Sequence, residues 1–94
     1  MLQEDSNKLS DEAHDLRRAI DSLKEELEAI NFYVQRAELC KDENLKKILL
    51  HNSKEEKEHA AMLIEWIRQH DKEFAHEAEE YFNSKEEDIA GKEH

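Results

Sequence analysis

Apolar residues recur along the first half of the chain in steps of three and four. They form one series without a missed step: Ala13, Leu16, Ile20, Leu23, Leu27, Ile30, Val34 and Ala37. This spacing places all of them on one face of an α-helix. Ser10 can cap such a helix, and Asp11 and Glu12 favour its first turn. The pattern predicts a helix over about residues 10–39, roughly 45 Å long.

A second amphipathic segment follows a polar break at residues 41–44. Its stripe has the same spacing but is apolar only towards its two ends: Leu45, Leu49, Asn52, Glu56, His59, Leu63 and Trp66. Either Asp42 or Asn44 can cap this helix, which should end near His70. A second long helix, interrupted by polar residues at its middle, is therefore predicted.

A third, shorter helix is predicted over about residues 72–83. Asp71 can cap it, and its apolar face would comprise Phe74, Ala78, Tyr81 and Phe82. Residues 1–9 and 84–94 carry no comparable pattern, and we expect both segments to be flexible. The chain is thus predicted to hold one helical domain, residues 10–83.

Two helices joined by a short connection pack as an antiparallel hairpin, but they cannot enclose a core. Composition agrees, because only 37% of the 94 residues are hydrophobic. Such a composition permits disorder, but good helix formers dominate and strand-forming runs are absent. We predict an all-α fold, a two-helix hairpin plus a short third helix, which pairs with a second copy into a four-helix bundle.

Charge and composition exclude several classes of function. The net charge of −11 opposes binding to nucleic acid. No stretch approaches the roughly 18 apolar residues of a membrane span, and the start MLQEDSNK lacks a secretory apolar region. We expect a soluble cytoplasmic protein with no membrane partner. The single cysteine, Cys40, allows neither an intrachain disulfide nor a cysteine-based metal cluster and is expected to be an inert thiol.

Three polar residues, Asn52, Glu56 and His59, stand in the second stripe where leucine would pack. Burying a carboxylate is costly, so Glu56 needs a cation, a proton or water. Glu56 and His59 are three residues apart and lie on one helix face. In ferritin-like di-iron proteins, two helices each supply a Glu-x-x-His pair of this kind, and the other two each supply a glutamate.

Glu26 is the best candidate for that additional glutamate. It shares a helical column with Ala19 and Tyr33, whereas Glu25 and Glu28 have a charged residue in theirs and are interpreted as solvated surface charges. Counted from the turn near residue 42, Glu26 lies about as far along the hairpin as the Glu-x-x-His pair, within a few ångström. One hairpin would supply half of a di-iron site.

A twofold axis at this level would join two copies of Glu26, Glu56 and His59 around two metal ions, one per subunit. Carboxylates with one imidazole per metal suit iron, although zinc would also bind such a set. Tyr33 is placed to hydrogen-bond a ligating carboxylate, and Asn52 is interpreted as setting register. The other histidines are expected at the surface or at helix ends, and the other aromatic residues in packing: His14, His51, His70, His76 and His94; Trp66, Phe74, Tyr81 and Phe82.

The segments KEELEAINFY (24–33) and LLHNSKEEKEHAAMLIEWIRQHD (49–71) resemble encapsulated ferritins, short two-helix ferritin-like proteins loaded into encapsulin shells. The resemblance covers roughly residues 14–83. It implies that two antiparallel chains form a ferroxidase centre between them, and that five dimers close into a ring-shaped homodecamer.

Matched by position, the resemblance assigns the di-iron ferroxidase centre to Glu26, Glu56 and His59. It further implies a metal entrance site at Glu25 and Glu28 and a supporting tyrosine at Tyr33. The residue before this tyrosine is often Trp in the family and is Phe here. Family members usually carry a Gly/Leu-rich C-terminal peptide that docks on the shell, or are fused to it, and the segment EEDIAGKEH has no such pattern.

Two functions are consistent with these features. The first is a ferroxidase that oxidises Fe(II) to Fe(III) with oxygen and supplies iron for mineral storage inside an encapsulin nanocompartment. The alternative is a non-catalytic acidic helical assembly module that binds divalent metal structurally. Loss of iron oxidation in alanine variants of Glu26, Glu56 and His59 would distinguish the first from the second.

Overall fold

The computed structural model describes residues 3–93, and these residues contain helices and turns but no strand. Helix α1 spans Asp11–Leu39, α2 spans Glu43–His70 and α3 spans Lys72–Tyr81. Short 3-10 helices lie at Ser6–Lys8 (η1) and Ala90–Lys92 (η2). The predicted all-α class is confirmed, and the three helices match their predicted ranges to within two residues.

Side-chain caps explain where the helices begin. Ser10 accepts a hydrogen bond from the Ala13 N–H at the start of α1, and Asp42, rather than Asn44, accepts one from the Leu45 N–H at the start of α2. Asp71 has two roles: its N–H donates to the Ile67 carbonyl at the end of α2, and its carboxylate caps α3. One residue therefore forms the whole corner between α2 and α3.

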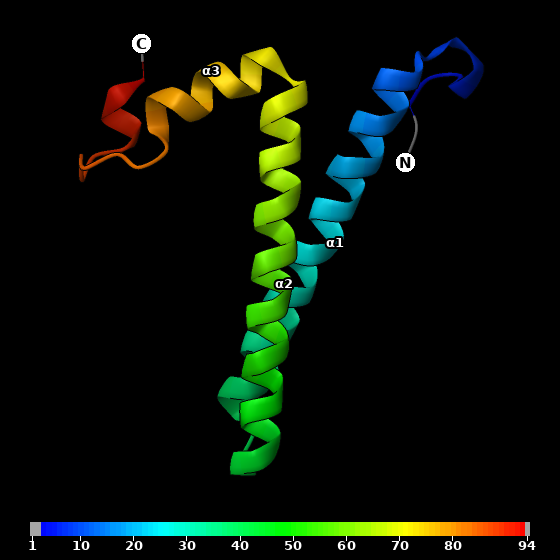
Figure 1. Cartoon of the computed structure of the whole chain (residues 1–94). Coiled ribbons are helices and arrows are strands. Elements are labelled where there is room, and N and C mark those ends of the chain that lie inside the picture. Colours follow the sequence, from blue (N-terminus) through cyan, green and yellow to red (C-terminus); the bar gives the residue numbers. More distant parts are fainter. Residues whose placement is uncertain (1–2, 94) are drawn as a thin grey trace.

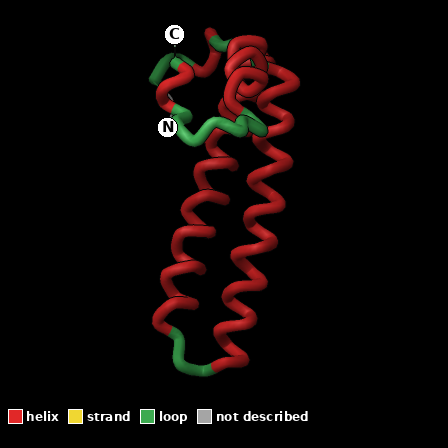
Figure 2. Tube along the Cα trace, turned by 90° about the vertical axis from the view of Figure 1, so that its left-hand side faces the viewer, coloured by secondary structure: helices red, strands yellow, loops and turns green. Residues whose placement is uncertain are grey.

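Helices α1 and α2 form an antiparallel hairpin whose closed end is the connection at residues 40–42 (Figures 1 and 2). Near this end the two helices lie side by side. Towards the other end they diverge, and α3 turns away from α2 on the side opposite the start of α1 (Figure 1). The lower part of the hairpin in Figure 1, from the connection to the middle, is therefore where the two helices run side by side.

The contact between α1 and α2 is a narrow heptad seam. Its buried and half-buried members step by three and four on each helix: Leu16, Ala19, Leu23, Glu26, Ile30, Tyr33 and Ala37 on α1, and Lys46, Leu49, Ser53, Glu56, Ala60, Leu63 and Ile67 on α2. Every second residue of the predicted α1 stripe lies on this seam: Leu16, Leu23, Ile30 and Ala37. Ile20, Leu27 and Val34 are exposed, because a single partner helix covers only two columns of a helix.

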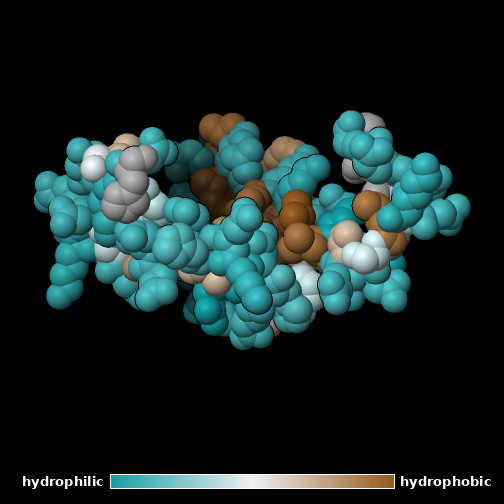
Figure 3. All heavy atoms as spheres, turned by 90° about the horizontal axis from the view of Figure 1, so that it is seen from above, coloured by the Kyte–Doolittle hydropathy of each residue, from teal (hydrophilic) through white to brown (hydrophobic). Residues whose placement is uncertain are grey.

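The hairpin does not enclose a core. The chain exposes 8007 Å², whereas a compact protein of this mass would expose about 5,700 Å². Its radius of gyration is 17.1 Å, against about 12 Å for a compact domain of this length. Figure 3 shows apolar residues gathered openly in the middle of the end-on view. About 2,300 Å² of surface thus exceeds what a self-sufficient monomer would leave exposed.

The segments outside the three α-helices fold back onto them. The His14 Nε2 lies 2.8 Å from the Ser6 carbonyl oxygen in η1. At the other end, the Lys92 ammonium donates to the Glu80 carbonyl at 2.7 Å and lies 5.9 Å from the centre of the Tyr81 ring. The flexibility expected of residues 1–9 and 84–94 stays a prediction. Within residues 3–93, no helix has the length and apolar character needed to cross a bilayer.

Candidate metal centre

Three side chains meet across the middle of the hairpin. The Nδ1 atom of His59 lies 3.4 Å from Glu26 Oε2 and 3.5 Å from Glu56 Oε2. One ligand atom from each residue lies within 4.8 Å of the other two. We call these three residues the seam cluster. The structure thus brings together the three residues that the helical spacing selected.

The fold explains this meeting. Glu26 and Glu56 both occupy seam positions, one near the middle of each long helix, so the antiparallel register brings them level. His59 lies one turn beyond Glu56 at the edge of the seam, and its Nδ1 atom lies within 3.5 Å of both carboxylates. Two elements far apart in sequence therefore supply one compact donor set.

Burial makes the seam cluster an unusual environment for charge. The side chains of Glu26 and Glu56 are 23% and 24% exposed, and that of His59 is 43% exposed. The Oε2 atom of Glu26 is inaccessible to solvent and accepts no hydrogen bond within the described part of the chain. A carboxylate oxygen removed from water without a donor is destabilising, and a cation relieves that cost.

The donor set fits a first-row divalent metal ion. Two carboxylates and one imidazole are ligands that iron, manganese and zinc accept, and no Lys or Arg within residues 3–93 forms an ion pair with either glutamate. Three side chains do not complete the four to six ligands that such ions take, so one hairpin leaves coordination positions free.

Tyr33 lies in the same seam column as Glu26 and is half-buried. Its ring centre is 5.7 Å from the Arg36 guanidinium, which also lies 5.6 Å from the Phe32 ring. Its hydroxyl has no hydrogen bond to a carboxylate within residues 3–93, so the supporting role expected of Tyr33 stays a prediction. The contact with Arg36 was not anticipated from the sequence, although Arg36 follows Tyr33 by three residues, a spacing that places the two side chains on one helix face.

Glu25 and Glu28 lie on the exposed side of α1, and neither belongs to the seam cluster. Their assignment as a metal entrance site is not tested by the hairpin alone.

Several of the other residues singled out in the sequence have local partners. His51 Nε2 lies 3.4 Å from Glu55 Oε1. His70 stacks on Trp66 with ring centres 3.9 Å apart, and its Nδ1 lies 2.8 Å from the Trp66 carbonyl oxygen. The Cys40 thiol donates to the Asp42 carbonyl at 3.5 Å. Asn52 is half-buried and His76 is exposed, whereas His94 lies outside the described residues.

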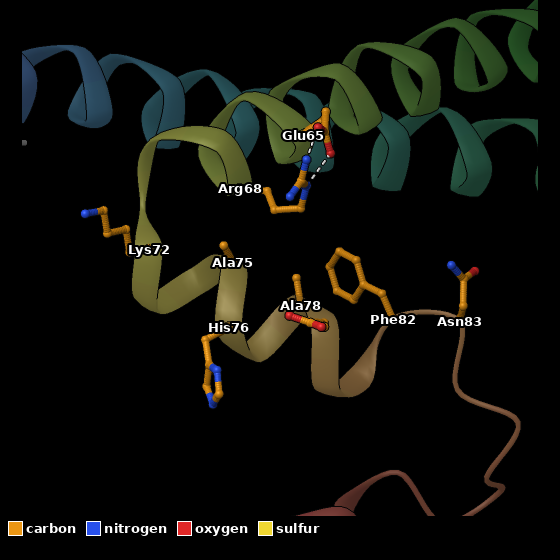
Figure 4. A pocket seen from close by; sticks show the side chains of 9 residues that line it. Glu65, Arg68, Lys72, Ala75, His76, Ala78, Phe82 and Asn83 are labelled. Atoms are coloured by element: carbon orange, nitrogen blue, oxygen red, sulfur yellow. Dashed lines mark hydrogen bonds and ion pairs between the residues drawn. The ribbon is translucent and has the colours of Figure 1, made fainter.

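A second polar group lies in the cleft between α2 and α3 (Figure 4). Arg68 donates two hydrogen bonds to Glu65, at 2.7 and 2.6 Å, and Gln69 donates a third at 2.8 Å. The hydrogen bonds from Arg68 and then from Gln69 lower the pKa of Glu65 from 4.5 to about 2. This cleft lies about 13 Å along α2 from Glu56 and offers no group of three metal donors among the described residues.

The sequence model of the EncFtn-like family matches residues 1–85. The chain belongs to the EncFtn-like family. The resemblance to encapsulated ferritins that the sequence motifs indicated is thereby confirmed, and the seam cluster lies inside the matched region.

Two curated relatives agree with membership of the EncFtn-like family. A ferritin-like protein of Thermotoga maritima is 53% identical over 62 residues, which are 66% of this chain and 54% of that protein. An encapsulated ferritin-like protein of Rhodospirillum rubrum is 47% identical over 73 residues, 78% of this chain and 52% of that protein. The chain therefore spans about half the length of the curated relatives it matches.

A solved structure gives the same fold. The crystal structure of protein ne0167 from Nitrosomonas europaea superposes with a TM-score of 0.87 at 53% sequence identity. The match covers 90% of this chain and 93% of that one. The hairpin with its short third helix is therefore a fold that this relative shares over nearly its whole length.

Proposed function

We propose that this EncFtn-like chain is a ferroxidase whose seam cluster binds Fe(II) as substrate and promotes its oxidation to Fe(III) by oxygen. The observation that carries the proposal is the buried Glu26 oxygen. It accepts no hydrogen bond within residues 3–93, and it belongs to a group of three possible metal ligands that lie within 4.8 Å of one another. A carboxylate placed in this way is destabilising until a cation binds.

Completion of the site requires a second copy of the chain. Two hairpins related by a twofold axis would contribute two copies each of Glu26, Glu56 and His59, enough for a di-iron centre with one iron per subunit at the interface. The flank of α2 that carries His59 supports this arrangement, because it also exposes Leu45 and Met62. Apolar residues beside a half-complete donor set favour burial against a partner.

A second uncovered flank supports assembly beyond the dimer. Ile20, Leu27 and Val34 share one exposed column of α1. In an antiparallel heptad pair this column borders the seam on the opposite side from the column of His59. Two separate apolar flanks on one hairpin are consistent with dimers that associate further, as in a homodecameric ring.

Charge provides the chemical rationale. Anionic oxygen ligands stabilise Fe(III) more than Fe(II), so a carboxylate-rich site favours loss of one electron from each iron to oxygen. The net charge of −11 attracts Fe(II) from solution, and the exposed Glu25 and Glu28 are candidate entrance residues. Tyr33, one heptad from Glu26, would hydrogen-bond a ligating carboxylate in the assembled site.

The Fe(III) product would pass to a mineral held by an encapsulin shell, since an open ring has no enclosed cavity of its own. The naming of the Rhodospirillum rubrum relative as encapsulated supports the shell as partner and a cytoplasmic nanocompartment as location. Residues 10–83 would form the ferritin-like domain, with residues 1–9 and 84–94 as flexible flanks. Neither nucleic acid nor membrane is a proposed partner.

One observation favours the alternative of a non-catalytic acidic helical module. A protonated His59, 3.4 and 3.5 Å from the two glutamates, would itself partly balance their charge without any metal. In that case the seam cluster would set the register of the hairpin, and divalent metals would bind it only structurally.

Anaerobic titration with Fe(II), followed by addition of oxygen, separates the two functions. The ferroxidase predicts about one tightly bound iron per chain and rapid oxidation, both lost in Glu26→Ala, Glu56→Ala and His59→Ala. Glu58→Ala is the matched control, because it removes one exposed acidic charge beside His59 without touching the cluster. Oxidation that persists at the wild-type rate in the three cluster variants would exclude the ferroxidase.

A further inference from the structure

The smallest seam side chains of α2 lie on either side of Glu56. Ser53 is three residues before it and is 1% exposed, and Ala60 is four residues after it and is 5% exposed. On α1, Glu26 is bracketed at the same spacing by the much larger Leu23 and Ile30. Small residues therefore bracket the ligand on one helix and large residues bracket the ligand on the other.

The antiparallel register matches these residues in pairs. With Glu26 and Glu56 level, helical rise places Leu23 within about 1.5 Å of the height of Ala60, and Ile30 within about 1.5 Å of the height of Ser53. A large side chain that packs over a small one lets two helices approach closely, since the axial separation is set by the side chains at the contact. The helices are thus held close together immediately above and below the seam cluster.

The hydroxyl group of Ser53 makes no hydrogen bond that would explain why a serine stands at this position. Its Oγ atom is buried and has no hydrogen-bond partner within residues 3–93. A buried hydroxyl without a partner is destabilising, so the polar group of Ser53 does not stabilise the hairpin. What Ser53 shares with Ala60 is small volume.

From this pairing we infer that Ser53 and Ala60 are positioning residues that set the distance between Glu26 on α1 and the Glu56–His59 pair on α2. The inference rests on the proposed function, because it concerns how that metal site is held. A larger side chain at either position pushes α1 away from α2 at the level of the cluster. The three ligand atoms, which now lie within 4.8 Å of one another, would then move further apart. Metal affinity would fall although both helices stay folded.

The experiment is an anaerobic titration of the full chain with Co(II), followed by its visible absorption, which reports ligand geometry without oxidation. Ala60→Val and Ser53→Val are expected to weaken Co(II) binding by about tenfold or more and to alter the spectrum. Ala37→Val is the matched seam control, since Ala37 is equally buried but lies about 16 Å along α1 from Glu26. Its melting temperature should fall, with Co(II) affinity unchanged within about twofold.

Two further variants separate size from chemistry. Ser53→Thr keeps the hydroxyl and adds volume, so it should weaken Co(II) binding; Ser53→Ala removes the hydroxyl without adding volume, so it should bind as wild type does. Ala61→Val places the same β-branched residue at the exposed neighbour of Ala60 and controls for helix propensity. Ser53→Thr, the smallest enlargement, is decisive if Ala60→Val does not fold by circular dichroism.

Each outcome has a distinct meaning. Enlarged variants that bind Co(II) like wild type, with melting temperatures lowered as in Ala37→Val, would reduce both positions to ordinary packing and overturn the inference. Loss of binding in Ser53→Ala would replace spacing with a role for the hydroxyl and would also overturn it. A wild-type chain that binds neither Co(II) nor Fe(II) would instead refute the proposed function, and the inference with it.

Discussion

The seam cluster and the Glu65–Arg68 pair are both polar groups anchored on α2, yet they are balanced in opposite ways. In the pair, a carboxylate receives three hydrogen bonds from Arg68 and Gln69, and its pKa falls to about 2. In the seam cluster, the Glu26 carboxylate has an inaccessible oxygen that accepts no hydrogen bond within the described chain. The charge of Glu65 is balanced by Arg68 on the same helix. The two glutamates of the seam cluster have no lysine or arginine partner within residues 3–93 and have only His59 beside them.

This difference explains why the α2–α3 cleft is a poorer candidate for a ligand site than the seam cluster. The α2–α3 cleft holds the pair, and Figure 4 shows Arg68 directed at Glu65 rather than into free space. Its charges are already matched, so a ligand would have to break hydrogen bonds to use them. The seam cluster has donors without matched charge, which is the condition that favours uptake of a cation.

The largest expected effect is on chemistry at the seam cluster. Glu26→Gln keeps the shape of the side chain and removes its charge, so the rate of Fe(II) oxidation should fall by about 100-fold or more. Glu65→Gln makes the same change in the pair and should leave the rate within about twofold. Stopped-flow absorbance after mixing with oxygen measures both. Equal losses in the two variants would remove the contrast between the two regions.

Metal should stabilise the chain through the seam cluster alone. A ligand at 100 times its dissociation constant raises the free energy of unfolding by about 2.7 kcal/mol. Anaerobic Co(II) should therefore raise the melting temperature of the wild type and of Glu65→Gln, but not that of Glu26→Gln. Differential scanning calorimetry with and without Co(II) provides the comparison. A shift that survives in Glu26→Gln would mean that metal binds elsewhere.

Without metal, the seam cluster should be a source of instability. Glu26→Leu removes a carboxylate that lacks a full partner and adds apolar contact on the seam, so the metal-free chain should gain about 1 to 3 kcal/mol in free energy of unfolding. Glu65→Leu removes a satisfied carboxylate and should lower that free energy. Urea unfolding in the presence of a chelator measures both changes. A destabilised Glu26→Leu chain would show that the glutamate is balanced internally after all.

The smallest effect is the pH dependence that the Glu65–Arg68 pair contributes. The folded pKa of Glu65, about 2, lies below its ordinary value of 4.5, so the stabilisation is present above about pH 4.5 and is lost as pH falls towards 2. The stability difference between wild type and Glu65→Gln should therefore be constant above pH 5 and shrink below it. Because the pair is exposed, added salt should reduce the difference. A difference that grows on acidification would contradict the assigned pKa.

The local structure of this chain follows closely from its sequence. Ser10, Asp42 and Asp71 cap the three helices because a side-chain oxygen before a helical run satisfies a free N–H of the first turn. Glu26, Glu56 and His59 could be selected because helical rise fixes their height along a hairpin. These are properties of neighbouring residues and of regular helix geometry, which a sequence pattern records directly.

Contacts between α1 and α2 were harder to predict from the sequence. The apolar series of α1 was expected on one helix face, and the hairpin covers only part of it: Leu23 and Ile30 lie on the seam, whereas Ile20, Leu27 and Val34 are exposed. The pairing of Arg68 with Glu65 was not anticipated, because many charged residues in this chain have a neighbour of opposite charge at helical spacing. When a helix has more than one apolar column, a single sequence does not show which of them the partner helix will cover.

The sequence by itself determined where the helices begin and end, which three donors lie level on the hairpin, and that 94 residues with so few apolar side chains would not close a core. Only the tertiary structure decided that the seam leaves Ile20, Leu27 and Val34 exposed, that one oxygen of Glu26 accepts no hydrogen bond within residues 3–93, and that Ser53 and Ala60 are buried on either side of Glu56. The physical reason is that helix periodicity orders side chains around one axis, whereas burial and pairing depend on the rotation and separation of two axes.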